Sequence, residues 1–281
     1  MPPDQSWWQT YSKMEDESRA RLRGILEVAA VPDAGRNTIT QKIGDYYASC
    51  MDEKAIEARG VEPLKPALDR IAKIASKSQF ADVAAALIDD NVLFRFSSRQ
   101  DFRDATQVIA NADQGGLGLP DRDYYTKDDA KSQELRQKYV AHVQKMLELL
   151  GDKPEAAAVD AQTVMRIETA LAQGSMTLVE RRDPKARDHK MSSGELERIT
   201  PEFQWRTYFA EVGAPSLPSL NVASPGFFKA LNDELEKETL DDWKAYLRWH
   251  LVNADAPHLS SAFLNEDFAF FGKTLRGQQE L

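Results

Sequence analysis

The stretch "DDAKSQELRQKYVAHVQKMLELLG", residues 128–151, carries the most regular hydrophobic pattern of the chain. Its apolar side chains recur at intervals of three and four residues, which places them on one face of a helix. These side chains are Leu135, Tyr139, Val143, Met146, Leu147 and Leu150. Gly151 follows them as a C-terminal stop signal. The segment is therefore predicted to be an amphipathic helix that begins near residue 128.

The same spacing recurs along most of the chain, so the predicted fold is mostly α, a multi-helix lobe forming one domain over residues 1–281. Further helices are predicted in 12–30, 37–53, 153–173, 192–200, 200–213, 224–237 and 239–275. Their N-terminal caps are predicted at Thr38, Ser192, Thr200 and Ser224. Residues 92–110 break the rhythm, because the run Val92–Phe96 and the alternation at 106–109 are typical of strands. One short β-hairpin is predicted there.

Composition excludes several classes of protein. The net charge of −9 disfavours nucleic acid as a partner. The longest apolar runs fall short of the roughly 18 residues that a membrane span needs. The single cysteine, Cys50, is predicted to be a buried residue on a helix, and it allows no internal disulfide. Residues 1–17 show no export signal, which leaves the compartment open.

The segment "DQGGLGLPDRDYY", residues 113–125, combines glycines, acids and aromatic residues. It lacks the spacing and the Lys-Ser/Thr pair of a phosphate-binding loop. Its glycines are predicted to adopt unusual backbone angles or to allow close backbone approach. Asp121, Arg122 and Asp123 are predicted to form a charged turn that leads into the next helix. The segment is therefore predicted to be structural.

The four histidines, His142, His189, His250 and His258, show no metal-binding spacing. The sequence contains no H-E-x-x-H, in which two histidines one helical turn apart hold zinc while the glutamate activates water. It also contains no G-x-S-x-G elbow. No catalytic residue and no metal ligand is therefore predicted, and we expect the chain by itself to hold no zinc.

Five ordered blocks add a resemblance. These are "QKIGDYYASCMDEKAIEARG", "QGGLGLPDRDYYTKDD", "RRDPKARDHKMSSGEL", "WKAYLRWHLV" and "FAFFGKTLRGQQEL". In order and spacing the chain resembles, over essentially its whole length, the N-terminal half of the neprilysin and endothelin-converting-enzyme family of zinc metallopeptidases. The run from Gly115 to Tyr125 is the most specific part of the match.

The resemblance implies an endopeptidase of two lobes that enclose a chamber for oligopeptides. A catalytic C-terminal lobe holds zinc through H-E-x-x-H and a downstream glutamate, and a helical lobe caps it. This chain corresponds to much of the helical lobe, so we expect it to be inactive alone and to need the catalytic lobe as a partner. The alternative is a non-catalytic helical module that binds peptides or proteins. The family is compatible with a periplasmic or extracellular location if the parent protein carries an export signal.

Substrate contacts are expected near the start of the chain, where the resemblance implies arginines that, in some family members, reach the C-terminal side of the bound peptide. The matching segment here, "DQSWWQTYSKMEDE", has no arginine. Its aromatic residues Trp7, Trp8 and Tyr11 are the candidate substrate-binding residues, and ordinary packing is the alternative. The pair Arg181 and Arg182 is predicted to form surface ion pairs rather than a clamp for a peptide carboxylate.

The helical lobe is also expected to expose an apolar surface where the catalytic lobe docks, and to self-associate through it. The candidate residues are Phe263, Phe268, Phe270 and Phe271. The alternative is that these side chains fold back onto the helix that carries Trp243 and Trp249.

Overall fold

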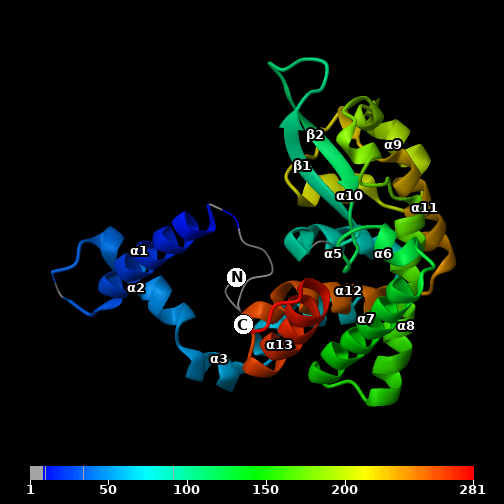
Figure 1. The fold of residues 1–281 in the computed structure, drawn as a ribbon. Helices are drawn as coiled ribbons and strands as arrows, with labels where there is room; N and C mark the ends of the chain where they lie inside the picture. Colours follow the sequence, from blue (N-terminus) through cyan, green and yellow to red (C-terminus); the bar gives the residue numbers. More distant parts are fainter. Residues whose placement is uncertain (1–8, 10, 34, 91) are drawn as a thin grey trace. The chain divides into compact units, whose positions relative to one another are not determined.

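The computed structural model describes residues 9, 11–33, 35–90 and 92–281. The chain divides into two compact units, one made of residues 1–62 and 258–281 and the other of residues 63–257. Helices dominate both units, as the hydrophobic spacing predicted (Figure 1). Among the described residues, none of the helices combines the length and the apolar character that a membrane crossing requires.

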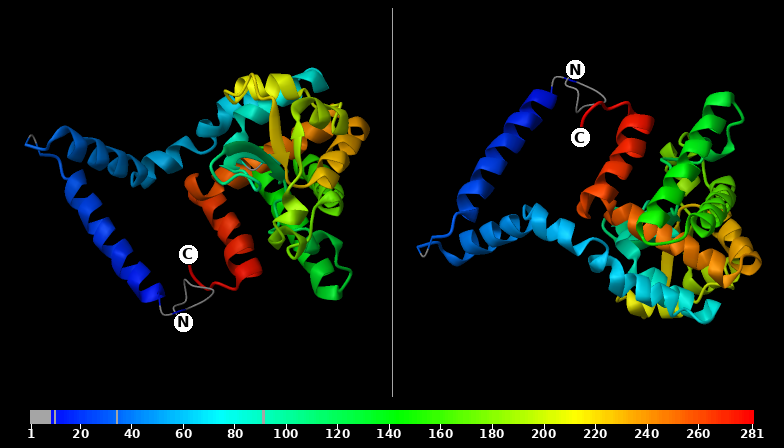
Figure 2. Two further views of the ribbon diagram at one scale, coloured as in Figure 1. Left: turned by 90° about the horizontal axis from the view of Figure 1, so that it is seen from above. Right: turned by 90° about the horizontal axis from the view of Figure 1, so that it is seen from below.

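Among its described residues, the first unit contains five helical elements. They are α1 (Ser12–Ala30), α2 (Thr38–Cys50), α3 (Glu53–Arg59), α13 (Ser261–Asp267) and the π-helix η7 (Phe268–Leu275). Helices α1 and α2 form a hairpin that diverges from its connecting turn (Figure 2). The helices meet where Gly44 lies against the backbone of Ala29, and a Cβ atom on Gly44 would stand 1.9 Å from the Ala29 carbonyl oxygen.

The α1–α2 hairpin leaves its apolar side chains in solvent. Between 43% and 75% of the surface of each of the following residues is exposed: Met14, Leu22, Ile25, Val28, Val31, Ile39, Ile43, Tyr46 and Met51. Cys50 at the end of α2 is exposed too, so the prediction of a buried thiol was wrong. The periodic pattern of α2 identifies an apolar helix face, but no core of its own unit covers that face.

The C-terminal phenylalanines were predicted to supply exposed apolar surface, and this was wrong for Phe263 and Phe270. Phe263 and Phe270 are each only 3% exposed. Phe268 and Phe271 are half-buried. Apart from Leu281 at the end of the chain, the large exposed apolar side chains among the described residues of this unit lie on or next to the α1–α2 hairpin instead.

The second unit is built around α8 (Pro154–Gly174), which packs against α7 (Ala130–Leu149), α11 (Pro225–Lys237) and α12 (Leu240–Asp255). Figures 1 and 2 show α7 and α8 side by side. The remaining helices are α4 (Lys65–Ala72), α5 (Phe80–Ala86), α6 (Asp123–Thr126), α9 (Ser193–Ile199) and α10 (Trp205–Glu211). Short 3-10 turns connect several of these helices.

Helix α7 follows its prediction closely. It begins two residues after position 128, capped by the Asp129 side chain, which accepts a hydrogen bond from the Ser132 amide. Tyr139, Val143, Met146 and Leu147 are fully buried. Gly151 ends the segment with a φ of 103°.

The predicted hairpin is present as β1 (Phe94–Gln100) and β2 (Val108–Gln114), paired antiparallel from Phe94 opposite Gln114 to Gln100 opposite Val108. Two further strands were not predicted, β3 (Lys190–Ser192) and β4 (Ser219–Val222). They complete a sheet of order β1-β2-β4-β3, in which β4 runs parallel to β2 and antiparallel to β3. Strands of three or four residues are too short to show an alternating pattern.

Only some of the predicted helix caps are present in the structure. Ser192 and Glu195 form the expected capping box, and Ser224 stands at the N-cap of α11 without a side-chain hydrogen bond. Asn37 rather than Thr38 caps α2. Thr200 caps no helix start, because it ends α9, where its hydroxyl donates to the Leu196 carbonyl.

Candidate functional site

The glycine-rich segment leaves β2 and passes close to Tyr139 in the middle of α7 and to Tyr246 and Trp249 of α12. Gly116 has a φ of +66°, and a Cβ atom there would lie 2.3 Å from the Tyr246 hydroxyl. At Gly118 a Cβ atom would lie 1.9 Å from the Tyr139 hydroxyl. The prediction of unusual angles or close approach is therefore confirmed at both positions.

The Glu168 side chain of α8 accepts hydrogen bonds that hold this segment in place. Its carboxylate accepts hydrogen bonds from the Tyr125 hydroxyl at 2.7 Å, from the Tyr139 hydroxyl at 2.7 and 3.0 Å, and from the Trp249 indole at 3.1 Å. The Gly118 amide donates to it at 3.3 Å. These five residues form the Glu168 cluster, in which the carboxylate itself is fully buried.

Donors at this density stabilise a buried carboxylate that would otherwise be costly to desolvate. Burial, followed by the charge of Glu168, raises the pKa of Tyr125 and of Tyr139 well above the ordinary value. Both phenols therefore stay protonated and remain donors. The Nε2 atom of His250 lies 3.0 Å from Glu168 Oε1, also fully buried. Because Glu168 and His250 are closed off from solvent, this arrangement is structural.

Sequence reasoning singled out Tyr125 and Gly118 but missed Glu168. A signal was present, since Glu168 lies four residues after Val164 and three before Leu171. All three side chains are fully buried. A charged residue on an apolar helix face indicates a buried polar partner.

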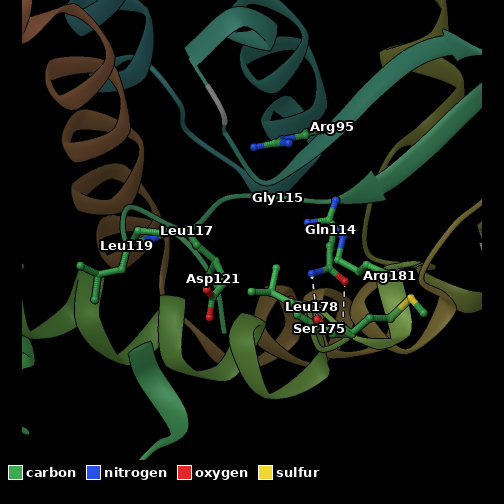
Figure 3. A pocket seen from close by; sticks show the side chains of 11 residues that line it. Arg95, Gln114, Gly115, Leu117, Leu119, Asp121, Ser175, Leu178 and Arg181 are labelled. Carbon is green, nitrogen blue, oxygen red and sulfur yellow. Dashed lines mark hydrogen bonds between the residues drawn. The ribbon is translucent and has the colours of Figure 1, made fainter. Parts of the chain in front are cut away.

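A pocket opens on the solvent side of the same segment (Figure 3). The pocket is partly open to solvent, and the space available to the centre of a water-sized sphere is about 50 Å³. The side chains of Arg95, Gln114, Leu117, Leu119, Pro120, Asp121, Ser175, Met176, Leu178 and Arg181 and the backbone of Gly115 line it. The residues come from β1, from the end of β2 and the glycine-rich segment that follows it, and from the chain segment after α8, so the fold brings distant parts of the sequence together at the site.

Arg181, which lines the pocket, also belongs to an ion-pair network around Asp113. The Asp113 carboxylate lies 2.8 Å from Arg187 Nη2 and 3.4 Å from Arg181 Nη2. The predicted ion pairing is therefore confirmed for Arg181. Arg182 is exposed.

The candidate substrate-binding residues lie elsewhere. Tyr11 belongs to the unit of residues 1–62 and 258–281, at the N-cap of α1, and is 65% exposed. Trp7 and Trp8 lie outside the described residues. The pocket lies wholly within residues 63–257.

The described part of the chain contains no group of three or more His, Cys, Asp or Glu side chains able to hold a metal ion. His142 is 2% exposed and contacts the ring of Trp249, with ring centroids 5.5 Å apart. His250 is buried against the Tyr246 ring at 4.3 Å. Both histidines are packed into the core.

Comparison with known proteins identifies the family. The model of peptidase family M13, in its N-terminal part, matches residues 1–281. Human endothelin-converting enzyme 1 is 26% identical over 96% of this chain, and neprilysin-3 of Drosophila melanogaster is 26% identical over 94%. The chain spans 36% of the length of each of these relatives.

Among solved structures, the zinc metalloprotease Zmp1 of Mycobacterium tuberculosis, in complex with an inhibitor, superposes with a TM-score of 0.93. It is 30% identical and covers 100% of this chain, while the chain covers 43% of Zmp1. The family resemblance drawn from the five sequence blocks is thus confirmed. The chain belongs to peptidase family M13 and is homologous to the N-terminal part of its zinc metallopeptidases.

Proposed function

We propose that this chain is the helical, chamber-forming N-terminal portion of a neprilysin-like zinc metalloendopeptidase that hydrolyses oligopeptides. The observation that carries the proposal is the match of the family model to residues 1–281, together with the likeness to Zmp1 over the whole chain. Residues 1–281 act in this proposal as one helical lobe. The lobe contributes shape and substrate contacts, whereas the chemistry comes from a zinc-binding lobe.

Zinc, when bound in that other lobe, would activate water for attack on a peptide bond. Nothing among the described residues of this chain could take that role, since no group of candidate ligands exists there. We therefore expect the chain alone to be inactive and to bind no stoichiometric zinc. Its own contribution is to confine and orient the peptide.

The exposed face of the α1–α2 hairpin is the proposed docking surface for the zinc-binding lobe. A groove of about 650 Å³ lies on the hairpin, lined by Arg21, Gly24, Ile25, Val28, Ala29, Thr40 and Ile43. An apolar face of this kind in contact with water is typical of an interface. The relatives are more than twice as long as this chain, which supports a further lobe as its occupant.

Tyr11, together with Trp7 and Trp8, remains the proposed substrate contact near the start of α1. The exposure of Tyr11 supports this, because its phenol ring is free to stack against a bound peptide. Changing Tyr11 to alanine should raise KM for an oligopeptide in the assembled enzyme while leaving kcat nearly unchanged.

The test is hydrolysis of a quenched fluorescent oligopeptide by this chain alone and together with a zinc-binding lobe of the same family. We expect activity only from the combination, and its loss on addition of a chelator. Chelator-sensitive hydrolysis that stays with the chain through repurification would contradict its inactivity. A folded, zinc-loaded combination without any activity would instead favour a peptide-binding module.

A further inference from the structure

We propose that the free edge of β1 binds an extended oligopeptide as an added antiparallel strand, and that Arg95 and Arg99 favour peptides with acidic side chains. The choice of an oligopeptide, rather than a strand of a folded partner, rests on the proposed function. The place and the charge preference rest on the hydrogen bonds and side chains of β1 itself. The strand lies wholly within the unit of residues 63–257.

Strand β1 stands at one edge of the sheet, since the order is β1-β2-β4-β3 and β1 pairs with β2 alone. Figure 1 shows the tip of the β1–β2 hairpin projecting past the neighbouring helices. The inner face of β1 is anchored, because the rings of Phe94 and Phe96 contact the Tyr208 ring at 5.1 and 5.6 Å between centroids. An edge that is held in place before binding loses little entropy when a peptide adds to it.

The hydrogen-bond pattern of the hairpin shows which residues face β2. The Asp101 amide donates to the Gln107 carbonyl at 3.0 Å, and these two residues continue the β1–β2 register by one pair. In an antiparallel ladder every second residue turns its backbone N–H and C=O toward the same neighbouring strand. The residues of β1 that face β2 are therefore Arg95, Ser97 and Arg99.

The intervening residues Phe96, Ser98 and Gln100 turn their backbone N–H and C=O groups away from β2. The same alternation is visible on β2, where the carbonyl of Ala112, opposite Phe96, accepts from the Ala223 amide on the side away from β1 at 2.8 Å. The outward groups of β1 bond to no described residue of the chain. They offer alternating donors and acceptors to a further strand.

Natural proteins usually blunt a free edge with a proline, a bulge or a very short strand. Strand β1, "FRFSSRQ", has seven residues and no proline, and its register with β2 is unbroken. The opposite edge strand, β3, has only three residues. Of the two edges, β1 is therefore the one that can accept an extended peptide.

The charges on β1 point to an acidic partner. Arg95 and Arg99 lie on the same face of the strand, and Arg95 stands opposite Asp113 in the ladder. The Asp113 carboxylate, however, pairs with Arg187 at 2.8 Å and with Arg181 at 3.4 Å. Neither Arg95 nor Arg99 forms an ion pair within the described part of the chain. Both guanidinium groups are therefore available to a peptide carboxylate.

Positive charge is crowded around Arg99. Its guanidinium lies 3.9 Å from the centroid of the Phe102 ring, on which it stacks. Burial, followed by the charge of Arg187, lowers the pKa of Arg99. A carboxylate brought beside Arg99 would offset this repulsion.

The same charges argue against a second copy of this chain as the added strand. Strand β1 contains no acidic residue, so pairing two β1 edges would bring the arginines of both copies onto one sheet with no carboxylate between them. Like charges on neighbouring strands destabilise the pairing.

The register of the added strand follows from the free groups. Peptide residues opposite Phe96, Ser98 and Gln100 exchange backbone hydrogen bonds with β1. Residues opposite Arg95 and Arg99 occupy the non-hydrogen-bonded positions, where side chains of adjacent strands come closest. The preferred peptide therefore carries two acidic side chains four positions apart, and its intervening alternate residues supply the backbone contacts.

The first experiment is an NMR titration of the chain with acetyl-Val-Glu-Val-Thr-Val-Glu-Val-amide, whose blocked ends carry no terminal charge. Binding should slow hydrogen exchange of the Phe96, Ser98 and Gln100 amides. The Ser97 and Arg99 amides serve as internal controls, because they already donate to β2. No detectable binding at about 1 mM peptide, which corresponds to about −4 kcal/mol, would overturn the proposal.

Backbone methylation of the probe tests strand pairing. N-methylation of the third and fifth residues, both valines, should weaken binding at least about tenfold, because their N–H groups donate to β1. N-methylation of the central threonine is the matched control and should weaken binding less than about threefold, because its N–H group points to solvent. Equal losses from the two modifications would contradict an added antiparallel strand.

A change of charge tests the roles of the arginines. The probe with lysine in place of both glutamates should bind about tenfold more weakly than the acidic probe. Arg95→Glu should narrow this difference, whereas Arg206→Glu should preserve it, because the Arg206 side chain is 89% exposed and pairs with Glu197. Equal affinity of the parent chain for both probes would remove the charge preference.

A proline substitution tests the edge on the protein side. Ser98→Pro removes one outward N–H group, and proline is tolerated on an edge strand where that group faces solvent. This variant should melt close to the parent and bind the acidic probe at least about tenfold more weakly, whereas Ser98→Ala should bind like the parent. Unchanged affinity in a folded Ser98→Pro would contradict the proposal, and the methylated probes decide the matter if this variant does not fold.

Failure of this proposal is distinguishable from failure of the proposed function, because the probes report binding to the chain alone. Hydrolysis of oligopeptides by the combined lobes without strand addition to β1 would remove the edge site only. Strand addition without hydrolysis would leave the edge site standing in a peptide-binding module.

Discussion

Glu168 joins the most specific sequence motif of the chain to the packing of its helices. Its carboxylate receives hydrogen bonds from Tyr125 and Gly118 of the motif and from Tyr139 and Trp249 of two neighbouring helices. This shared acceptor ties the loop of the motif to α7, α8 and α12. The motif is therefore explained by folding rather than by catalysis.

Glu168→Gln should destabilise the chain by at least about 2 kcal/mol. The amide group of glutamine would turn a donor toward donors and leave buried groups without partners. Urea unfolding followed by circular dichroism measures the change. Glu197→Gln is the control, since its exposed ion-pair partner Arg206 predicts a change below about 0.5 kcal/mol. Equal stability of Glu168→Gln and the parent chain would contradict the structural role.

Gly118→Val and Gly116→Val should each lower the melting temperature, for different reasons. At Gly118 the new side chain would collide with the Tyr139 hydroxyl, and at Gly116 it would also meet a positive φ that valine disfavours. Gly194→Ala in α9, where the nearest atom is a flexible arginine tip at 3.9 Å, should melt no lower than the parent. An unchanged melting curve with lost peptide binding would point to a functional loop instead.

Asp90 should make stability depend on pH. Burial, followed by the nearby carboxylates of Asp255 and Asp89, raises the pKa of Asp90 from 3.8 to about 6, and His250 opposes this rise. Because the folded state holds this proton more tightly than the unfolded state, its stabilising contribution is full below pH 3.8 and is lost as pH rises through about 6. Half-burial limits the loss to about 1 kcal/mol.

Asp90→Asn should remove this loss, so that its free energy of unfolding falls less than that of the parent between pH 4 and pH 6. Urea unfolding at several pH values measures it. Asp241→Asn is the control, since the Asp241 side chain is 95% exposed. Parallel pH profiles of parent and Asp90→Asn would rule out Asp90 as the source.

At the residue scale, sequence reasoning located the glycine-rich segment but not its partners. Gly116 and Gly118 could be predicted as tight positions because several glycines in one short segment indicate close approach. Glu168 and Arg95 could not be placed beside them, since they lie 50 and 23 residues away from Gly118 along the chain. Tertiary contacts of this separation leave no local pattern.

The packing of α1 against α2 depends on a single position, Gly44. Gly44 is the buried residue of α2, and its lack of a side chain lets α2 approach the Ala29 carbonyl. An ordinary helix propensity argument favours alanine there by about 0.5–1 kcal/mol. The close contact reverses that preference.

Gly44→Ala should therefore separate the two helices and increase hydrogen exchange of the α1 and α2 amides. Gly24→Ala supplies the matched control on α1, because no atom lies within 4 Å of its added Cβ. That substitution should stabilise the helix by about 0.5–1 kcal/mol. Slower exchange in both variants would show that the helices are not held by this contact.

At the element scale, long periodic segments were predictable and short ones were not. The helix of 130–149 and the hairpin of 94–114 follow from patterns many residues long. Strand β4 has four residues and pairs in parallel with β2, more than 100 positions away. Thr200 looked like a cap because Pro201 follows it, yet its hydroxyl accepts the Trp205 indole N–H at 2.8 Å. A tertiary hydrogen bond outweighed the local signal.

For the whole molecule, the apolar hairpin face has a consequence for association. The sequence predicted exposed apolar surface but assigned it to phenylalanines, two of which are buried. Hydrophobic periodicity identifies which residues share a helix face and carries no information about whether that face lies in its own chain's core or in an interface. Only the fold distinguishes α1 and α2 from α7.

Ile25→Asp should weaken binding of the zinc-binding lobe at least about tenfold, because burying an isoleucine contributes about 1.5–3 kcal/mol and a carboxylate in its place adds a desolvation cost. Ile25 is 62% exposed and lines the groove on the hairpin. Val108→Asp is the control, since Val108 is 71% exposed on β2 in the other unit. Light scattering of the chain alone should show concentration-dependent self-association that Ile25→Asp reduces and Val108→Asp does not. Two results together would show that the hairpin face is not the docking surface: the parent chain is a monomer at all concentrations, and Ile25→Asp binds the zinc-binding lobe as tightly as the parent does. If the complex buried the hairpin face, a charge at Ile25 would have to weaken binding.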